Sequence, residues 1–437
     1  MPETSLSYRA LVRAAVTVVP LLALVDSKVR AGHRGRRGAE GHLSEWARRG
    51  RDPARPLAWF HASSVGEGLQ AGSVIDELRR LQPDCQFVFT HFSPSAEPLA
   101  KRLSVDASGY APYDLPGPTG ALLDALRPDL VVFSKLDLWP ELATQAAARG
   151  VPVAIVAGTV SPGSSRLRWP ARSLLAPGYG SVVAAGVIAE PDASRLALLG
   201  VDRSAIHVLG DPRFDSVMQR VRATGADDAL LRFGRGAPTL IAGSTWPADE
   251  SLLIEAFAGL SATRPDARLI VVPHEPTPTH LAALDRLAAR ASLERPVRLS
   301  EATGPVRLMV VDRVGVLATL YGAGSMAYVG GGFGRAGLHS VLEPAAWALP
   351  VAFGPRWQES RDAELLIEGR AAIAIETAVA LRRIWKVWLT DESNRVAQGR
   401  RAREVVEGGL GAARRSAELL GRLISSRHPR TSPSAAR

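Results

Sequence analysis

The sequence is nearly devoid of cysteine, with Cys85 alone among 437 residues. A single cysteine excludes an internal disulfide and any metal site built on several thiolates, and it fits a reducing compartment. The nine histidines do not cluster at the spacing of metal ligands, so we predict no structural metal. Aromatic residues make up only 6% of the chain, which disfavours a nucleic-acid-binding surface of interleaved cations and aromatic rings.

Biased segments and multiple long apolar runs are also lacking. The chain is 46% hydrophobic and 22% charged, values that are ordinary for a globular protein. Its 40 glycines and 31 prolines are scattered without a period. This composition excludes a wholly disordered, collagen-like, coiled-coil or polytopic membrane protein. At about 150 residues per domain, the length predicts two or three domains.

Positive charge is in excess, with 53 basic against 43 acidic residues and a net charge of +10. Such an excess favours anionic partners. Arginine carries nearly all of it, so a bias in codon usage is the alternative explanation. Residues 28 to 55, however, include nine basic residues and only three acidic ones. This local excess follows directly after an apolar segment, which codon usage does not explain.

The apolar segment is Leu11–Val25, interrupted by Arg13 and Pro20. It falls short of the roughly 20 residues of a spanning helix and is followed by no convincing signal-peptidase site. The basic flank would keep that side in the cytoplasm and attract anionic headgroups, at about 1 kcal/mol per cation near the surface. We therefore expect residues 1–30 to be a membrane anchor, either spanning or interfacial. The alternative is a first core helix followed by a solvated loop.

The body of the chain alternates short apolar runs with amphipathic helical stretches, a pattern typical of βα units and a parallel sheet. No apolar run interrupts residues 221–237, after which the pattern restarts. We predict two Rossmann-like domains, residues 31–222 and 223–425, and a disordered tail at 426–437. The expected strands are residues 57–63, 85–92, 128–134, 151–158, 239–244, 267–273, 306–312, 325–331 and 350–355.

Doubly wound sheets bind ligands beyond the carboxyl ends of their strands, so polar residues there are candidate site residues. In the glycine-rich segment Gly330–Pro344, a helix expected from Leu338 would offer its N–H groups to a phosphate. Tight turns also need glycine, and the segment is not a strict dinucleotide fingerprint. Glu67 follows the first strand. It is either a general base or an ordinary acidic residue on the first turn of a helix. Ser244 and Thr245 precede a helix and would serve as ligand contacts or as caps.

Six segments in order resemble the 3-deoxy-D-manno-octulosonic acid (Kdo) transferases, glycosyltransferases of the GT-B fold. The resemblance extends from Tyr8 to about Ala374. It implies two Rossmann-like domains facing a central cleft, with an N-terminal membrane-associated helix. The six segments are WFHASSVGE (59–67), LDLWPE (136–141), GDPRFD (210–215), GSTWPADE (243–250), VPHEP (272–276) and YVGGGFGRAGLHSVLEPA (328–345).

The resemblance also implies an activity: transfer of Kdo from CMP-Kdo to the lipid A precursor lipid IVA in lipopolysaccharide biosynthesis. The expected place is the cytoplasmic face of the inner membrane, with its anionic surface as a partner and no nucleic acid partner. No cofactor or metal is expected besides the donor substrate, because CMP is a good leaving group and a helix dipole stabilises it. A GT-B transferase using another nucleotide sugar is the alternative, because the fold does not determine the donor.

Roles follow motif by motif from the same resemblance. Glu67 matches the family's general base, Asp137 the acid of its E-x-W-P segment, and Arg213 a basic residue that would hold the leaving phosphate or the sugar carboxylate. The sequence departs from the family at Trp246, where histidine is usual, and at Ser340, where asparagine is usual. The expected nucleotide contacts are Ser244, Thr245, His274, Glu275, Val314, Gly315, Val316, Ser340, Val341, Leu342 and Glu343, with Glu343 on the ribose.

Overall fold

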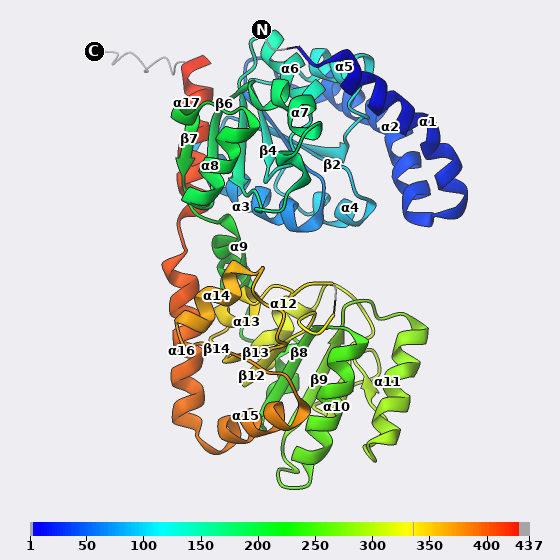
Figure 1. Cartoon of the computed structure of the whole chain (residues 1–437), viewed down its shortest axis with the longest axis vertical. Coiled ribbons are helices and arrows are strands. Elements are labelled where there is room, and N and C mark those ends of the chain that lie inside the picture. The colour runs from blue at the N-terminus through cyan, green and yellow to red at the C-terminus, as the bar shows by residue number, and fades with distance from the viewer. Residues whose placement is uncertain (1–2, 335, 428–437) are drawn as a thin grey trace. The chain divides into compact units, whose positions relative to one another are not determined.

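The computed structural model describes residues 3–334 and 336–427, and it divides into two compact units (Figure 1). Unit 1 comprises Met1–Ser216 together with Leu410–Arg437, and unit 2 comprises Val217–Gly409. Helix α9 (Pro212–Ala223) carries the chain from unit 1 into unit 2. The predicted two α/β domains, each with a parallel sheet, are confirmed.

Unit 1 is built on a parallel sheet of seven strands in the order β3-β2-β1-β4-β5-β6-β7. The central strands β1, β2, β4 and β5 are buried along their whole length, so their apolar runs lie in a sheet covered on both faces. The strands are β1 (Leu57–Ala62), β2 (Gln86–His91), β3 (Ala107–Tyr110), β4 (Leu130–Ser134), β5 (Val153–Gly158), β6 (Val182–Val187) and β7 (Ile206–Val208). The helices are α1 (Leu6–Val25), α2 (Ser27–Arg49), α3 (Val65–Leu81), α4 (Glu97–Ala100), α5 (Pro116–Leu126), α6 (Pro140–Ala148), α7 (Ala171–Tyr179), α8 (Glu190–Leu199) and α17 (Ala412–Arg427).

Unit 2 repeats this plan with the strand order β10-β11-β9-β8-β12-β13-β14, again parallel. Because the strands run the same way, their carboxyl ends form one edge of the sheet. The strands are β8 (Thr239–Thr245), β9 (Arg268–Pro273), β10 (Val297–Arg298), β11 (Leu308–Val310), β12 (Met326–Val329), β13 (Val351–Phe353) and β14 (Ala372–Ala374). The helices are α10 (Pro247–Ser261), α11 (Pro278–Arg290), α12 (Leu317–Leu320), α13 (Leu342–Ala346), α14 (Arg361–Glu368), α15 (Ala378–Thr390) and α16 (Glu392–Gly408).

The predicted domain boundaries are wrong at the C-terminus. Helix α17 returns to unit 1 and packs against α3, with Ala413, Ala417 and Leu420 buried in the core beneath it. The Asp215 carboxylate accepts hydrogen bonds from the backbone N–H groups of Gly411 and Ala413, at 2.8 and 2.9 Å. Figure 1 shows α17 in red beside β6. An amphipathic helix fits the open face of either sheet, so its pattern alone does not assign it to one.

The division within α9 also differs from the prediction, because unit 1 ends at Ser216 and not at residue 222. The predicted disordered tail begins too early, since residues 426 and 427 belong to α17. The rest of that predicted tail, residues 428–437, lies outside the described residues.

The N-terminal segment forms two packed helices, α1 and α2, drawn in dark blue in Figure 1. Arg9 near the start of α1 makes two hydrogen bonds to the buried carboxylate of Glu141, at 2.8 and 2.9 Å. Farther along α1 the apolar side chains are open, with Leu21 66% and Leu24 71% exposed. Among the described residues, α1 is the one helix long and apolar enough to cross a membrane. The basic flank is helical and not a loop, and Arg30 donates to the carbonyl oxygens of Ala23 and Leu24 at the end of α1.

Candidate active site

Glu67 lies at the carboxyl edge of the unit 1 sheet, on the first turn of α3, directly after β1. One carboxylate oxygen, Oε2, accepts hydrogen bonds from the backbone N–H groups of Ser63 and Ser64, each at 3.1 Å. The other oxygen, Oε1, has no hydrogen-bond partner among the described residues. Glu67 is thus a first-turn acid, as one alternative predicted, and it forms a capping box with Ser64. This role does not exclude catalysis, because the cap holds the side chain in place and leaves one oxygen available as a base.

Asp137 follows β4 at the same edge and lies close enough for its charge and that of Glu67 to interact. Its atom Oδ2 is buried without a hydrogen-bond partner, and Oδ1 lies 3.8 Å from Nη2 of Arg166. Burial, and secondly the charge of Glu67, raise the pKa of Asp137 to about 6. The preceding Lys135 has a positive φ of 62°, a backbone conformation that is strained for a residue with a side chain. The structure thus places two carboxylates of different environment side by side, an arrangement that suits proton transfer.

The raised pKa of Asp137 predicts a pH-dependent cost to stability. A carboxyl whose pKa is higher in the folded state loses stability as pH rises from its unfolded pKa near 3.9 to its folded pKa near 6. Asp137→Asn should match the wild type in thermal midpoint at pH 3 and exceed it at pH 7.5, where the gain in free energy of unfolding is up to about 3 kcal/mol, because the amide carries no charge. Asp124→Asn is the control, because Asp124 is exposed and pairs with Arg149. An Asp137→Asn midpoint that shifts equally at both pH values would contradict the assignment.

Arg213 lies on the first turn of α9 and is held by a buried acid two residues earlier. Its Nε and Nη2 contact Oδ2 of Asp211 at 2.8 and 2.6 Å, and Nε2 of Gln70 donates to Oδ1 of the same carboxylate at 3.2 Å. The guanidinium therefore has a defined position and remains 38% exposed. Sequence reasoning missed Asp211, although the acid within GDPRFD was its signal.

In unit 2, the loop after β12 is held by the buried carboxylate of Asp249. Its Oδ2 accepts from the backbone N–H groups of Trp246 and Gly331, at 3.0 and 2.9 Å, and its Oδ1 accepts from the Tyr328 hydroxyl at 2.8 Å. Gly331 has a φ of 96°, and a Cβ there would lie 2.1 Å from the carbonyl oxygen of Gly337. These bonds draw the glycine-rich loop against the end of β8.

The predicted helix from Leu338 is wrong: α13 begins at Leu342 and is five residues long. The reason is that the loop folds back on itself, with the N–H of His339 donating to the carbonyl oxygen of Gly330 at 3.2 Å. The glycines here serve close approach between protein backbones, as the tight-turn alternative predicted. The side chains of Val341 and Leu342 are buried, so only their backbone groups remain as possible ligand contacts.

Three flat side chains stack at the carboxyl edge of unit 2. Ring centroids are 4.9 Å apart for Trp246 and His274 and 4.4 Å apart for His274 and His339. Nε1 of Trp246 donates to Nε2 of His339 at 2.9 Å, so the His339 proton belongs on Nδ1. Burial, and secondly His274, lower the pKa of His339 to about 4, which keeps its ring neutral. His339 was not predicted as a site residue. Its contacts with Trp246 and His274 join residues far apart in the chain and are seen only in the folded structure.

The remaining predicted nucleotide contacts divide between open and buried positions. Thr245 is fully buried, and its hydroxyl donates to Oε1 of Glu250 at 2.8 Å. Its side chain therefore contributes to packing at the end of β8 and is not exposed to a ligand. Ser244 has a positive φ of 52° at the strand end and is partly exposed. Glu343 forms an ion pair of 3.0 Å with Arg220, and burial raises its pKa against the opposing effect of that arginine. The exposed or partly exposed candidates are His274, Glu275, Val314, Val316 and Ser340, with Gly315 at a turn of positive φ.

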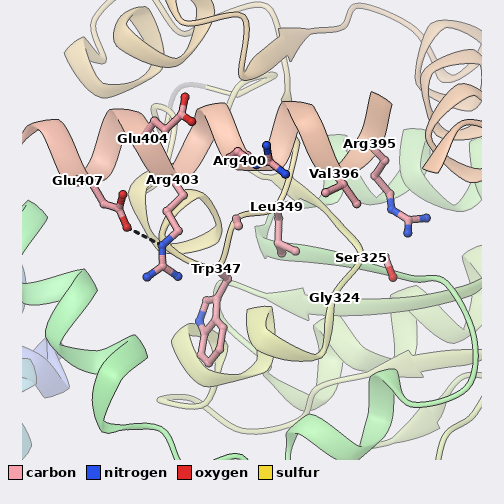
Figure 2. Close-up of a pocket in the computed structure, with 11 residues that line it drawn as sticks. Gly324, Ser325, Trp347, Leu349, Arg395, Val396, Arg400, Arg403, Glu404 and Glu407 are labelled. Atoms are coloured by element: carbon pink, nitrogen blue, oxygen red, sulfur yellow. Dashed lines mark hydrogen bonds and ion pairs between the residues drawn. The ribbon is translucent and has the colours of Figure 1, made fainter. Parts of the chain in front are cut away.

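Unit 2 also holds a cavity of about 660 Å³ away from this edge (Figure 2). Gly324 and Ser325, which precede β12, and Leu349, which precedes β13, place it at the amino ends of these strands. Figure 2 shows Arg403 paired with Glu407, four residues on along the same helix, α16; the two side chains lie 2.8 Å apart. The cavity is therefore separate from the strand-end residues.

Comparison with known proteins identifies relatives over most of the chain. The family described as 3-deoxy-D-manno-octulosonic-acid transferase (kdotransferase) matches residues 39–216. A 3-deoxy-D-manno-octulosonic acid transferase of Bordetella pertussis is 30% identical over 415 residues, covering 88% of this chain and 93% of that protein. One from Haemophilus influenzae is 25% identical over 372 residues, covering 83% and 86%.

Solved structures of similar fold include a UDP-GlcNAc 2-epimerase from Neisseria meningitidis bound to UDP-GlcNAc. It has a TM-score of 0.62 at 12% identity and covers 84% of this chain and 100% of its own. A putative UDP-N-acetylglucosamine 2-epimerase from Listeria monocytogenes has a TM-score of 0.59 at 13% identity, covering 86% and 98%. At such low identity these likenesses establish the two-domain fold alone.

Proposed function

The chain belongs to the 3-deoxy-D-manno-octulosonic acid (Kdo) transferase family, and from this premise we propose that it transfers Kdo from CMP-Kdo to lipid IVA, the lipid A precursor. The observation that carries the proposal is the pair Glu67 and Asp137 at the carboxyl edge of unit 1, with Oε1 of Glu67 available as a base. Mass analysis of lipid IVA after incubation with CMP-Kdo tests it.

The proposed reaction is an inverting displacement at the anomeric carbon of Kdo. The acceptor oxygen forms its bond to that carbon as the bond from the carbon to the CMP phosphate oxygen breaks, and CMP leaves with the electron pair. Oε1 of Glu67 takes the proton of the acceptor hydroxyl. Asp137, ionised above pH 6, adds a nearby negative charge that favours proton uptake by the carboxylate pair.

Membership of the family assigns contacts with the donor to individual residues of this chain. Arg213, fixed by Asp211, would meet the sugar carboxylate or the departing phosphate as a planar donor of two hydrogen bonds. The stack of Trp246, His274 and His339 offers an uncharged flat surface for the base. Ser340 would contact the phosphate, and Glu343 would contact the ribose. To accept hydrogen bonds from the ribose, the Glu343 carboxylate must give up part of its ion pair with Arg220. No cofactor besides the donor is required, because the CMP phosphate is a good leaving group.

We also propose that α1 attaches the protein to the inner membrane, with the two units on the cytoplasmic face. The exposed apolar side chains of α1 lie beside the cations of α2, a combination that binds an anionic bilayer surface through burial of apolar area and through charge. The folded-back contact of Arg30 with the end of α1 keeps the basic helix next to the apolar one.

Substitution of exposed apolar residues tests this attachment better than deletion, because Arg9 of α1 satisfies the buried Glu141. Leu21→Asp with Leu24→Asp is expected to move most of the protein from the membrane pellet to the supernatant, since both leucines are exposed in the fold. The control is Leu198→Asp on α8, because this leucine is 52% exposed and lies outside α1 and α2. Retention of the double variant in the pellet, at the wild-type level, would contradict the role of α1.

A further inference from the structure

A second cavity, of about 800 Å³, lies within unit 1 between α2, the edge strand β3 and helix α4. Volumes of this size are typical of small-molecule sites. Two glycines line its wall on α2. Gly35 lets the helix lie close to the Tyr110 ring, where a Cβ would be 2.4 Å away, whereas the wall is open at Gly38, where a Cβ would meet nothing within 4 Å. The cavity is therefore an open groove along the last strand of the sheet.

The groove extends from the carboxyl edge of the sheet toward its amino edge. Gly35 packs beside Tyr110 at the carboxyl end of β3. Past the end of α2, Arg51 and Asp52 contact the side chain of Gln86, the first residue of β2. Helix α2 thus runs opposite to the strands, and its earlier residues lie near the candidate active site.

The chemistry of the lining changes along the groove. At the carboxyl end lie Arg34, His91 and Tyr110, and toward the amino end lie Trp46, Leu103 and Val105. Asp106 also lines the amino end, and its carboxylate accepts hydrogen bonds from Arg79 and from the Phe87 N–H. One end is thus polar and basic, whereas the other is mainly apolar. A ligand that satisfies both ends is an amphiphile with its head at the strand ends and its chain under α2.

The charges at the head end favour an anionic head. Glu97 accepts from Lys101 at 2.8 Å and from the Tyr110 hydroxyl at 3.1 Å, so these charges compensate one another. Arg34 is exposed and has no partner among the described side chains. An uncompensated cation remains where the head would lie.

Helix α2 is held firmly enough to act as a wall. The guanidinium of Arg36, 8% exposed, stacks 3.5 Å from the Phe92 ring centroid and donates to the Phe92 carbonyl oxygen. Nδ1 of His33 lies 3.0 Å from the Tyr113 hydroxyl. These contacts bind α2 to the loops after β2 and β3.

We propose that this groove binds a fatty-acyl chain of the acceptor lipid, with the anionic head of the lipid at Arg34. The proposal deepens the proposed function and rests on it for the identity of the acceptor. The neighbouring α1 supports a lipid occupant, because its exposed leucines would lie in the bilayer from which such a chain enters. The groove then positions the acceptor hydroxyl by its tail, at the edge where Glu67 lies.

Two glycines of α2 give a matched test. Gly38 and Gly41 are both exposed, and a Cβ on either would meet nothing within 4 Å, yet only Gly38 lines the groove. Leucine improves helix propensity equally at both positions, so neither variant should lose its fold. Gly38→Leu fills the groove, and Gly41→Leu does not.

The probe is dodecyl phosphate with a photoreactive diazirine at the chain end, applied to full-length protein and mapped by mass spectrometry. We expect labelling near Trp46 or within residues 103–107, reduced at least tenfold by Gly38→Leu and unchanged by Gly41→Leu. Equal labelling of this region in both variants, or labelling confined to residues 6–25, would overturn the proposal.

Kinetics separate this proposal from the proposed function. With lipid IVA as the acceptor, Gly38→Leu should raise KM at least tenfold, whereas with the deacylated acceptor it should leave KM unchanged. An equal effect on both acceptors would overturn the acyl site while transfer itself remained established. Loss of labelling in Gly38→Leu, together with no transfer by the wild type, would keep the lipid groove and refute the proposed acceptor.

Discussion

Glu67→Gln is expected to lower the turnover number of Kdo transfer by about 10²- to 10⁴-fold, the usual contribution of a general base. The amide oxygen can still accept the hydrogen bonds of Ser63 and Ser64, so the turn before α3 should keep its shape. The amide has no oxygen basic enough to take the proton of the acceptor hydroxyl. CMP affinity, measured by calorimetry, should therefore stay within about twofold of the wild type, since the base acts on the acceptor alone.

Glu77→Gln on the same helix is the matched control for this variant. Glu77 forms an exposed ion pair with Arg80 at 2.9 Å, and its loss should leave turnover unchanged. A Glu67→Gln enzyme that retains more than about a tenth of wild-type turnover would refute the role of Glu67 as the base.

Asp249→Ala is expected to lower the thermal midpoint of unit 2 by about 10 °C and to abolish measurable CMP binding. The carboxylate is fully buried and satisfies two backbone N–H groups and the Tyr328 hydroxyl. Alanine leaves all three donors without a partner, at about 1–3 kcal/mol each before local rearrangement. The loop that carries His339 and Ser340 would then no longer be held at the end of β8.

Asp249→Asn distinguishes the hydrogen-bond role from a requirement for charge. Its amide oxygen can accept from Trp246 and Gly331, and its NH₂ group can donate to the Tyr328 phenol, which accepts in turn. We expect most of the stability and CMP affinity to be retained. A midpoint as low for asparagine as for alanine would contradict this account, and Glu255→Gln, exposed on the same helix, should change neither quantity.

The longer strands were predictable from sequence because a parallel sheet buries both faces of its strands. The runs around Trp59, Phe89 and Val132 lie in β1, β2 and β4, as expected. The short strands β3, β7, β10 and β14 were missed. Segments of two to four residues at a sheet edge carry too few apolar residues to be distinguished from a loop. Strand β6 was also missed, because Ala184, Ala185 and Gly186 give it little apolar signal.

The edge positions of the candidate site residues were predictable, whereas their partners were not. Strand ends are visible in a sequence, and so Glu67, Asp137 and Ser244 were found. The bonds of Asp249 to Gly331, of Asp211 to Gln70, and of Trp246 to His339 join residues far apart in the chain, and no local pattern reports them. The return of α17 to unit 1 was missed for the same reason. Its amphipathic pattern predicts that one face is buried, but it does not indicate which sheet that face packs against.

The most direct test of the proposed activity is the mass of the lipid product. Full-length protein is incubated with lipid IVA and with CMP-Kdo generated in situ, and the lipid is analysed by mass spectrometry. We predict a product heavier than lipid IVA by one or more whole Kdo residues, and at least a hundredfold less of it per unit time with Glu67→Gln. Unmodified lipid IVA, from wild-type protein that binds CMP in calorimetry, would contradict the proposed acceptor, and absence of CMP binding would contradict the donor as well.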